Sequence, residues 1–340
     1  MTRIVASAPG KLVLLGEYAV LQGAPALVLA VDRRVHVTLT HADAGYWEIV
    51  SPTLALQARL RLHDGKATWV DNARAELAWV AMLLARFPQA EHMPACRIEL
   101  DSDAFYLDHA GTRAKLGLGS SAALTVALLG ALHALAQLVP PTLEEAVAAH
   151  RAIQHGHGSG IDVAASLAGG LSRFELDGHT AQVLAMALPR GLRWCCVYSG
   201  RSASTGAMLA QVAAWHAREP AAFTQHTREL ATISAHGIAA IAADHADAFL
   251  MSLHDYADAL ARFGEAAGAD IASREHRAIA AIATDCGCVY KSCGAGGGDV
   301  GVTFAAEDTR LRAFAARAAQ AGYPVVELEA DPQGLVVSTV

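Results

Sequence analysis

The sequence contains no apolar run of the length that a membrane-spanning helix requires. Such a helix needs about 20 consecutive apolar residues, and no apolar stretch in this 340-residue chain approaches that length. The opening residues, MTRIVASAPGKL, also lack the apolar segment of a secretory signal peptide. We therefore expect a cytoplasmic protein with no membrane partner.

Positive charge is also scarce. The chain has 26 Lys and Arg against 33 Asp and Glu, a net charge of −7 at pH 7. This balance lacks the basic footprint of a nucleic-acid-binding protein, so we expect no nucleic-acid partner. An acidic protein can still bind phosphate groups where a few cations and backbone N–H groups gather at one site.

Cysteine is sparse, and its spacing does not predict a metal site. Cys286, Cys288 and Cys293 lie close together, but C-x-C-x4-C without a second half is a poor zinc pattern. Hydrophobic residues make up 53% of the sequence and charged residues 17%, which excludes disorder and allows large cores.

Length and element order indicate two α+β domains. At roughly 150 residues per domain we expect domains at residues 1–188 and 189–340. Apolar runs and alternation predict strands at 4–8, 26–41, 96–103, 171–176, 190–200, 300–305 and 324–328. Helical spacing and Ala-rich composition predict helices at 73–87, 121–138, 142–154, 204–217, 221–243, 246–266 and 272–285. Thr142 and Glu145 form the capping box of the third helix.

Glycine punctuates the first segment of interest, APGKLVLLGEYAVL at 8–21. Lys11 follows directly after a predicted turn, so its ammonium could be held at a fixed place in a cleft. The alternative is a surface turn with a solvated lysine.

A second segment, GLGSSA at 117–122, leads directly into an apolar helix. Glycines let successive N–H groups point at one anion, and a helix N-terminus adds positive charge. The hydroxyls of Ser120 and Ser121 could bind a phosphate oxygen or Mg²⁺, or one of them could simply cap the helix. The segment is not a Walker A loop, because no Gly-Lys-Ser/Thr follows.

The third segment, KSCGAGGGD at 291–299, carries four glycines in five positions. Ordering so many glycines is costly, which favours close backbone approach to a ligand over a plain loop.

Two further segments carry candidate site residues. GSGID places Asp162 at the start of a short helix, where it could instead be an N-cap. SGRSAST at 199–205 places hydroxyls and Arg201 at a strand-to-helix junction that suits an anion.

In this order, the five segments resemble those of the GHMP kinase superfamily, named for galactokinase, homoserine kinase, mevalonate kinase and phosphomevalonate kinase. The matching stretches are APGKLVLLGEYAVL, KLGLGSSAALTVA, GSGIDVAASLAGG, SGRSASTGAML and KSCGAGGGDVGV, and they span residues 8–302. Each stretch is modest evidence alone, whereas their joint order and spacing are highly specific.

The resemblance implies an N-terminal ATP-binding domain like ribosomal protein S5 domain 2 and a C-terminal ferredoxin-like domain. It also implies an ATP-dependent small-molecule kinase that uses Mg²⁺ and binds a phosphorylated small molecule, as a monomer or homodimer. The catalytic residues would then be Lys11 and Asp162. The ATP phosphates would be bound by Gly117, Leu118, Gly119, Ser120, Ser121 and Ala122, with Ser120 or Ser121 as the Mg²⁺ ligand. The acceptor would be bound by Tyr18, Ser159, Arg201, Ser202, Ser204, Lys291, Gly294, Ala295 and Gly296.

Within the superfamily, GSGIDVA and SGRSAST resemble the phosphomevalonate kinases more than the mevalonate kinases. Asp299 stands where mevalonate kinases usually carry glycine, and Arg151 stands where they usually carry a magnesium-binding Glu. These features favour conversion of phosphomevalonate to diphosphomevalonate, in isoprenoid precursor synthesis. Mevalonate kinase or another small-molecule kinase of the superfamily is the alternative. A non-catalytic ATP-binding sensor is the alternative of a different class, although the chain retains the expected catalytic lysine and aspartate.

Overall fold

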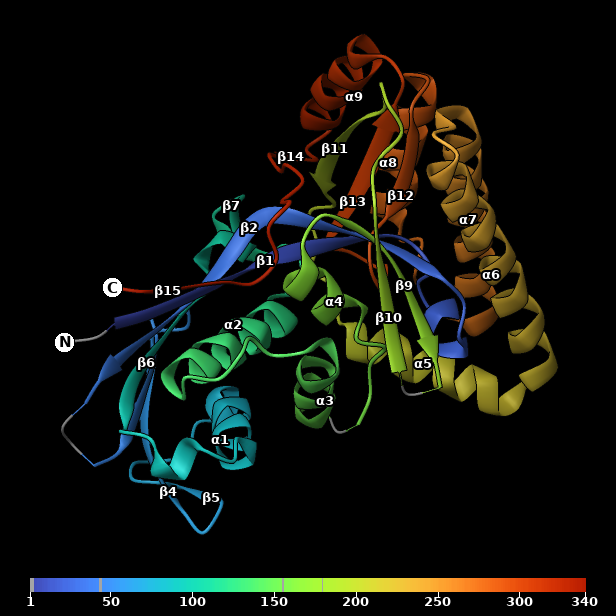
Figure 1. Ribbon diagram of the computed structural model, residues 1–340. Coiled ribbons are helices and arrows are strands. Elements are labelled where there is room, and N and C mark those ends of the chain that lie inside the picture. Colours follow the sequence, from blue (N-terminus) through green and yellow to red (C-terminus); the bar gives the residue numbers. More distant parts are fainter. Residues whose placement is uncertain (1–2, 43–44, 155, 179) are drawn as a thin grey trace.

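The computed structural model describes residues 3–42, 45–154, 156–178 and 180–340. Apart from one hairpin, the strands of these ranges form two sheets, each covered by helices (Figure 1), so the predicted α+β class is confirmed. Within these ranges no helix combines the length and the apolar character that crossing a membrane requires.

Two long antiparallel strands, β1 (Arg3–Leu15) and β2 (Ala26–His41), form the centre of the first sheet. The sheet has the strand order β10-β9-β2-β6-β3-β4-β5, and β1 pairs with both β2 and β15. The remaining strands are β3 (Trp47–Ser51), β4 (Leu56–His63), β5 (Lys66–Trp69), β6 (Cys96–Asp101), β9 (Leu171–Asp177), β10 (Thr180–Met186) and β15 (Val336–Thr339). A separate hairpin consists of β7 (Tyr106–His109) and β8 (Thr112–Lys115).

Helices α1 (Ala78–Arg86), α2 (Ser120–Leu135), α3 (Leu143–Ile153) and α4 (Ile161–Ala168) lie together on one face of this sheet (Figure 1). The sequence of α2 is apolar on all sides, and the helix is buried as predicted. The predicted capping box is also confirmed, because Thr142 and Glu145 exchange hydrogen bonds at the start of α3.

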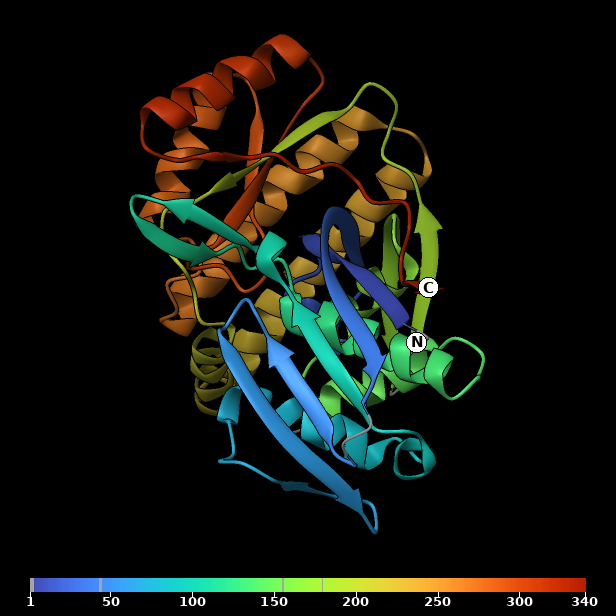
Figure 2. The same ribbon diagram turned by 90° about the vertical axis from the view of Figure 1, so that its left-hand side faces the viewer.

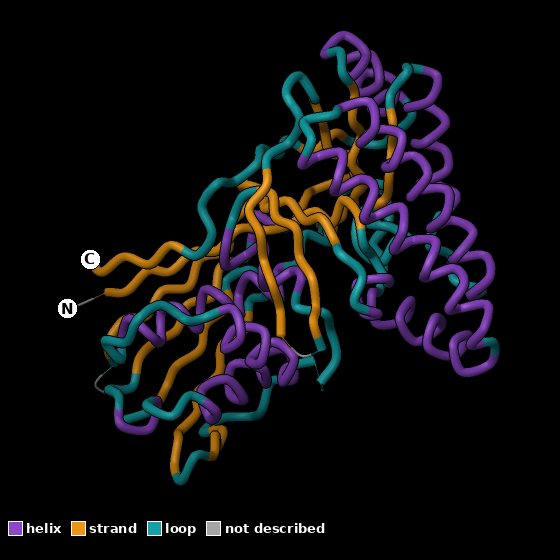
Figure 3. The backbone as a smooth tube through the Cα atoms, turned by 45° about the vertical axis from the view of Figure 1, so that its right-hand side comes forward, coloured by secondary structure: helices purple, strands orange, loops and turns teal. Residues whose placement is uncertain are grey.

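The second sheet has the strand order β12-β13-β11-β14, with β11 (Arg193–Tyr198), β12 (Val289–Ser292), β13 (Val300–Ala305) and β14 (Val325–Val326). Helices α5 (Thr205–Arg218), α6 (Pro220–Ala242), α7 (Ala246–Ala267) and α8 (Arg274–Asp285) separate β11 from β12, and α9 (Asp308–Gln320) separates β13 from β14. This order of strands and helices is ferredoxin-like, with extra helices in the first crossover. Figure 3 shows the long α6 and α7 running side by side.

Several elements differ from the sequence predictions. The first strand does not stop at residue 8 but continues to Leu15, because pairing with β2 resumes after a register shift between Pro9 and Gly10. Lys11 therefore lies in a strand rather than after a turn. The sequence predictions missed the strands β3, β4, β5, β7, β8, β10 and β15, the helix α9, and the 3₁₀ helices Ala19–Gln22, Ala75–Leu77, Ala90–His92 and Asp103–Phe105.

The C-terminal segment does not stay with the second sheet. After β14 the chain returns to the first sheet, where β15 pairs with β1, so the two ends of the chain lie close together (Figure 2). A domain boundary between residues 188 and 189 stays a prediction. Such a boundary assigns β15 to the C-terminal domain, although this strand pairs with β1 in the first sheet.

Candidate active site

Lys11 lies where three of the predicted site segments meet. Its backbone N–H donates to Leu118 O over 2.9 Å, which ties β1 to the turn before α2. The side chain is buried, and Nζ lies 3.4 Å from Gly117 O and 3.6 Å from Asp162 Oδ1. A Cβ placed on Gly294 would lie 3.8 Å from the same Nζ. The ammonium therefore faces all three segments at once.

The 117–122 turn presents unpaired backbone N–H groups at the start of α2. Gly117 and Gly119 have φ angles of 71° and 81°, in the left-handed region that favours glycine. Gly119 is the N-cap of α2, and no side chain caps the helix within the described chain. Among the same residues, the amides of 117–122 have no hydrogen-bond acceptor. Donors of this kind, at the positive end of a helix dipole, can bind an anion.

The two serines of this turn differ in exposure. Ser120 is buried, whereas Ser121 is exposed and its Oγ lies 3.3 Å from Nε2 of His150. Burial lowers the pKa of His150, so its imidazole is neutral at pH 7 and can share a hydrogen bond with the hydroxyl. Ser121 is therefore the better placed of the two to contact a group bound outside the helix.

The 293–299 loop, which follows β12, also keeps free N–H groups. Gly294, Gly296 and Gly297 have φ angles of 73°, 77° and 78°. Gly297 N donates to Ile271 O over 2.8 Å. In contrast, the amides of Gly294, Ala295 and Gly296 have no acceptor among the described residues. The loop therefore offers a second set of backbone donors beside Lys11.

Asp299 joins this loop to its neighbours. Its N–H donates to Arg201 O over 2.7 Å, and its Oδ1 accepts the N–H of Ala203 at 3.2 Å. Its carboxylate packs so closely on Gly117 that a Cβ there would overlap it. Burial raises the pKa of Asp299. The side chain thus links the 117–122 turn, the 199–205 segment and the 293–299 loop.

Asp162 is available to face the ammonium because it does not cap α4. Gly160 is the N-cap, and the N–H of Ile161, the first residue of the helix, donates to Ser159 Oγ over 3.3 Å. The preceding turn is held by Arg151, whose guanidinium donates to the carbonyl oxygens of Gly158 (3.0 Å) and Ser159 (3.1 Å). Arg151 therefore stabilises the backbone that carries the carboxylate.

Of the other predicted acceptor-binding residues, Arg201, Ser202 and Ser204 lie beside the 293–299 loop. Ser159 instead lies buried just before α4, where its hydroxyl accepts the N–H of Ile161. Arg201 is exposed, and its Nη1 lies 3.3 Å from Asp270 and 3.4 Å from Glu275. Ser202 is exposed, and Ser204 is exposed while accepting an N–H of α5 as its N-cap. This segment can contact a molecule bound against the loop, although the charge of Arg201 is partly compensated.

The hydroxyl of Tyr18 is hydrogen-bonded to the 293–299 loop. Its hydroxyl donates to Ala295 O over 2.6 Å, and its ring packs 4.9 Å from that of Phe263. Burial raises the pKa of this hydroxyl, which keeps it protonated as a donor. Tyr18 therefore stabilises the loop, and its hydroxyl proton is not free to be donated to the acceptor substrate.

Lys291 was predicted to bind the acceptor, and its position conflicts with that role. The side chain is fully buried, pairs with the carboxylate of Glu17, and donates to Ser292 O over 2.7 Å. Its Nζ also lies 5.5 Å from the ring centre of Tyr256. An ammonium with these partners and no exposed surface links β12 to the segment after β1.

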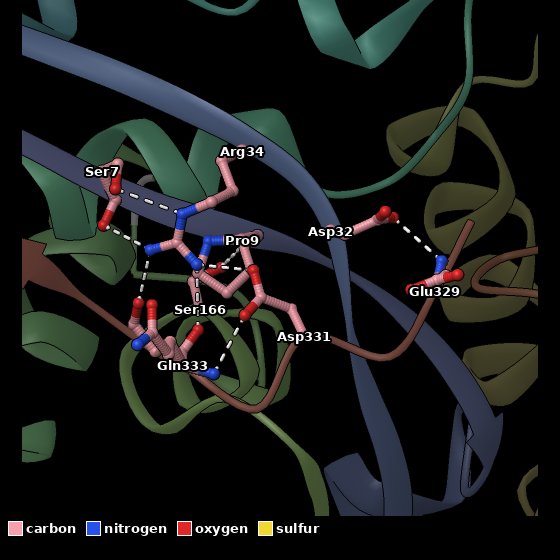
Figure 4. A network of polar contacts seen from close by, with 9 residues as sticks. Ser7, Pro9, Asp32, Arg34, Ser166, Glu329, Asp331 and Gln333 are labelled. Atoms are coloured by element: carbon pink, nitrogen blue, oxygen red, sulfur yellow. Dashed lines mark hydrogen bonds and ion pairs between the residues drawn. The ribbon is translucent and has the colours of Figure 1, made fainter. Parts of the chain in front are cut away.

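Sequence reasoning missed two buried polar residues that fix this geometry. Glu17 is the partner of Lys291, and Ser166 in α4 donates to Pro9 O over 2.9 Å (Figure 4). The latter bond holds the helix that carries Asp162 against the strand that carries Lys11. The signal for both was a polar residue within an apolar run, because buried polar groups need partners.

A network of hydrogen bonds around Arg34 also stabilises β1, the strand that carries Lys11. The Arg34 guanidinium donates to Ser7, to the Asp331 carboxylate at 2.5 Å, and to the carbonyl oxygens of Gln333 and Gly334 (Figure 4). It lies opposite the register shift in β1. The returning C-terminal segment is therefore fixed beside the part of β1 that leads into Lys11.

Replacing Ser166 with alanine is expected to lower both stability and activity. The buried carbonyl of Pro9 would lose its donor, which costs about 1–3 kcal/mol of unfolding free energy, and α4 could shift relative to β1. The matched control is Ser234→Ala, which removes a buried hydroxyl that donates to Pro25 O over 2.6 Å, away from Lys11. Urea unfolding should show similar losses for both variants, whereas only Ser166→Ala should lower kcat/KM, by about tenfold. Equal activity of the two variants would contradict the positioning role.

Comparison with known proteins places this site in a family. Residues 77–170 match the GHMP kinases N terminal domain. A phosphomevalonate kinase from Streptomyces sp. (strain CL190) is 31% identical over 88% of this chain and 89% of its own length. A mevalonate kinase from Thermococcus onnurineus is 30% identical over 62% of this chain and 61% of its own. The structure of Streptococcus pneumoniae phosphomevalonate kinase, in complex with phosphomevalonate and AMPPNP, matches the fold with a TM-score of 0.77 at 17% identity, covering 96% of this chain and 99% of that one.

The fold and the site define an ATP-dependent small-molecule kinase. The two sets of free backbone amides on either side of a buried lysine fit the needs of phosphoryl transfer, which depends on positioning and charge neutralisation. The chain belongs to the GHMP kinase family.

Proposed function

We propose that this protein transfers the γ-phosphoryl group of ATP to phosphomevalonate, giving diphosphomevalonate and ADP in the mevalonate pathway. The observation that carries the proposal is the position of Lys11 Nζ, within 3.4 Å of Gly117 O and 3.6 Å of Asp162, between the two sets of free amides. The choice of acceptor rests on the GSGIDVA and SGRSAST segments and on the Streptomyces relative, which is named for this substrate.

Each of the two sets of backbone amides binds a different substrate. The 117–122 turn and the α2 dipole bind the β- and γ-phosphates of ATP. The 293–299 loop and the 199–205 segment bind the anionic acceptor. Lys11, between them, stabilises negative charge on the transferred group, and a preorganised ammonium in a partly dry site is effective in that role. The transfer breaks the bond between the γ-phosphorus and the bridging oxygen of ADP and forms a bond to an acceptor oxygen.

Magnesium fits the oxygen atoms that this chain offers. The exposed hydroxyl of Ser121 is a hard oxygen donor of the kind that Mg²⁺ prefers. Because Arg151 replaces the acidic residue of mevalonate kinases and is engaged with a backbone turn, phosphate oxygens and water would complete the coordination shell. When bound, Mg²⁺ neutralises phosphate charge.

Asp162 then has an orienting role. A phosphate acceptor is already ionised near pH 7, so the reaction needs no general base, and the carboxylate holds the Lys11 ammonium in place. Replacing Asp162 with asparagine is expected to reduce kcat about tenfold or less with phosphomevalonate, whereas loss of a general base would cost 10²–10⁴-fold. Steady-state ADP release measures the difference. A loss above about 10²-fold with phosphomevalonate would contradict the orienting role.

An acceptor panel tests the substrate assignment directly. ADP release from the purified protein with ATP and Mg²⁺ would be measured with phosphomevalonate, mevalonate, homoserine and galactose. We expect the highest kcat/KM with phosphomevalonate. A preference for mevalonate would assign the protein to the mevalonate kinases instead, and ATP binding without turnover of any acceptor would indicate a sensor.

A further inference from the structure

The peptide between Gly298 and Asp299 is held at both of its polar atoms. Its carbonyl oxygen, on Gly298, lies 2.9 Å from Nε2 of His276, and its N–H, on Asp299, donates to Arg201 O. The 293–299 loop has few side chains of its own, so its shape depends on such contacts from neighbours. Within the described chain, the side chains that hold its carbonyl groups are Tyr18 and His276.

The protonation of His276 follows from its two partners. Burial lowers the pKa of His276 to about 4, so the imidazole is neutral and carries one proton at neutral pH. A carbonyl oxygen can only accept, so the proton must be on Nε2, where it is donated to Gly298 O. Nδ1 then accepts from the Tyr290 hydroxyl, which lies 2.7 Å away. One chain of donors thus runs from Tyr290 through His276 to the loop.

Tyr290 is itself fixed in one position. Its ring lies across Gly301 of β13, where any Cβ would overlap the phenol. Burial raises the pKa of the Tyr290 hydroxyl, which therefore stays protonated as the donor to Nδ1. The imidazole is consequently held in one orientation by a residue of the ferredoxin-like sheet, and it transmits that orientation to the loop.

We propose that His276 is a positioning residue that holds the 293–299 loop in the shape that binds the anionic group of the acceptor. The proposal rests on the proposed function, in which this loop supplies the backbone donors for that group. The critical atom is Nε2, because this ring nitrogen hydrogen-bonds to the loop whereas Nδ1 bonds to Tyr290. Removing the N–H at this atom would leave the 298–299 peptide held only at its N–H, by Arg201 O, so that its carbonyl could tilt and misalign the amides of Gly294, Ala295 and Gly296.

Two substitutions separate the nitrogen atoms of the ring. The side-chain amide of His276→Gln places an N–H near the position of Nε2, whereas that of His276→Asn reaches only the position of Nδ1. His133→Gln is the matched control, because Nδ1 of buried His133 contacts a backbone carbonyl, Val139 O at 2.7 Å, at the far end of α2. All three variants disturb a buried histidine, so thermal unfolding should show losses of the same order.

We expect the kinetic effects to differ. His276→Asn should raise KM for the acceptor about tenfold, the effect of one lost hydrogen bond, while KM for ATP changes less than about twofold. His276→Gln should restore KM for the acceptor to within about threefold of the wild-type value, and His133→Gln should leave it unchanged. KM would be measured with whichever acceptor the panel identifies.

Hydrogen exchange provides a readout that needs no substrate. The amides of Gly297 and Asp299 donate to Ile271 O and Arg201 O, outside the loop, so they should exchange faster in His276→Asn than in His276→Gln. This difference would persist even if phosphomevalonate proved not to be the acceptor. The proposal is overturned if the Asn and Gln variants agree in exchange, or if they agree in KM for the active acceptor, or if the loss falls equally on ATP.

Discussion

Replacing Lys11 with methionine should lower kcat/KM about 10³-fold while leaving the protein folded. Methionine keeps most of the buried volume and removes only the charge that faces the transferred phosphoryl group. Loss of one preorganised charged donor at a transition state costs about 10²–10³-fold, and loss of a cation in phosphoryl transfer costs up to about 10⁵-fold. Asp162, the remaining partner, is partly exposed and tolerates the loss of its ion pair.

The matched control is Lys66→Met. Lys66 is exposed on β5, at the edge of the first sheet, and contributes nothing to the site. ADP release would be measured for both variants, together with binding of a fluorescent ATP analogue to separate affinity from turnover. Because the lysine acts on the transferred group, the loss should fall mainly on kcat. A reduction in kcat of less than about tenfold, or an equal loss in Lys66→Met, would remove Lys11 from the mechanism.

The glycine-rich segments could be predicted from the sequence because their requirements are local. A backbone that adopts positive φ and exposes N–H groups favours glycine, and the expected residues, Gly117, Gly119, Gly294 and Gly296, all have positive φ. That these glycine-rich segments lie close together around Lys11 could be predicted only from the resemblance to a known superfamily. The contacts join residues more than a hundred positions apart, as between Lys11 and Gly117.

The partners of buried polar side chains could not be predicted in the same way. Lys291 was predicted to bind the acceptor because an anionic substrate needs cations, but its partner Glu17 lies 274 positions away in the sequence. The position of His276 could, however, be recognised from the sequence pattern of α8. It shares the buried face of α8 with Ile279 and Ala283, three and seven positions further on. A histidine within an apolar stripe must find hydrogen-bond partners, although the sequence does not say which ones.

The buried pair of Glu17 and Lys291 should dominate the stability of the junction between the two sheets. Replacing Lys291 with methionine would leave a carboxylate without compensation in the interior, which typically costs about 3–5 kcal/mol of unfolding free energy. Burial already raises the pKa of Glu17, against the opposing effect of Lys291, and one of its oxygens, Oε2, has no partner among the described residues. Removing the lysine raises that pKa further.

The pH dependence of this destabilisation has a defined sign. A carboxyl group whose pKa is raised in the folded state favours folding below its unfolded pKa, taken as 4.5, and this contribution is lost as the pH rises through the folded value. Urea unfolding of Lys291→Met should therefore show a larger loss of stability at pH 8 than at pH 5. The control is Arg97→Met, which breaks a partly exposed pair with Glu48 and should cost about 1 kcal/mol or less.

A double-mutant cycle completes the argument. Glu17→Gln combined with Lys291→Met leaves no buried charge, so its cost should be smaller than the sum of the two single losses, by about 1–3 kcal/mol. Additive losses would mean that the two side chains are not coupled. A Lys291→Met protein of normal stability that had lost only its affinity for the acceptor would instead show that the lysine leaves its carboxylate partner to bind substrate, which would restore the role first predicted from the sequence.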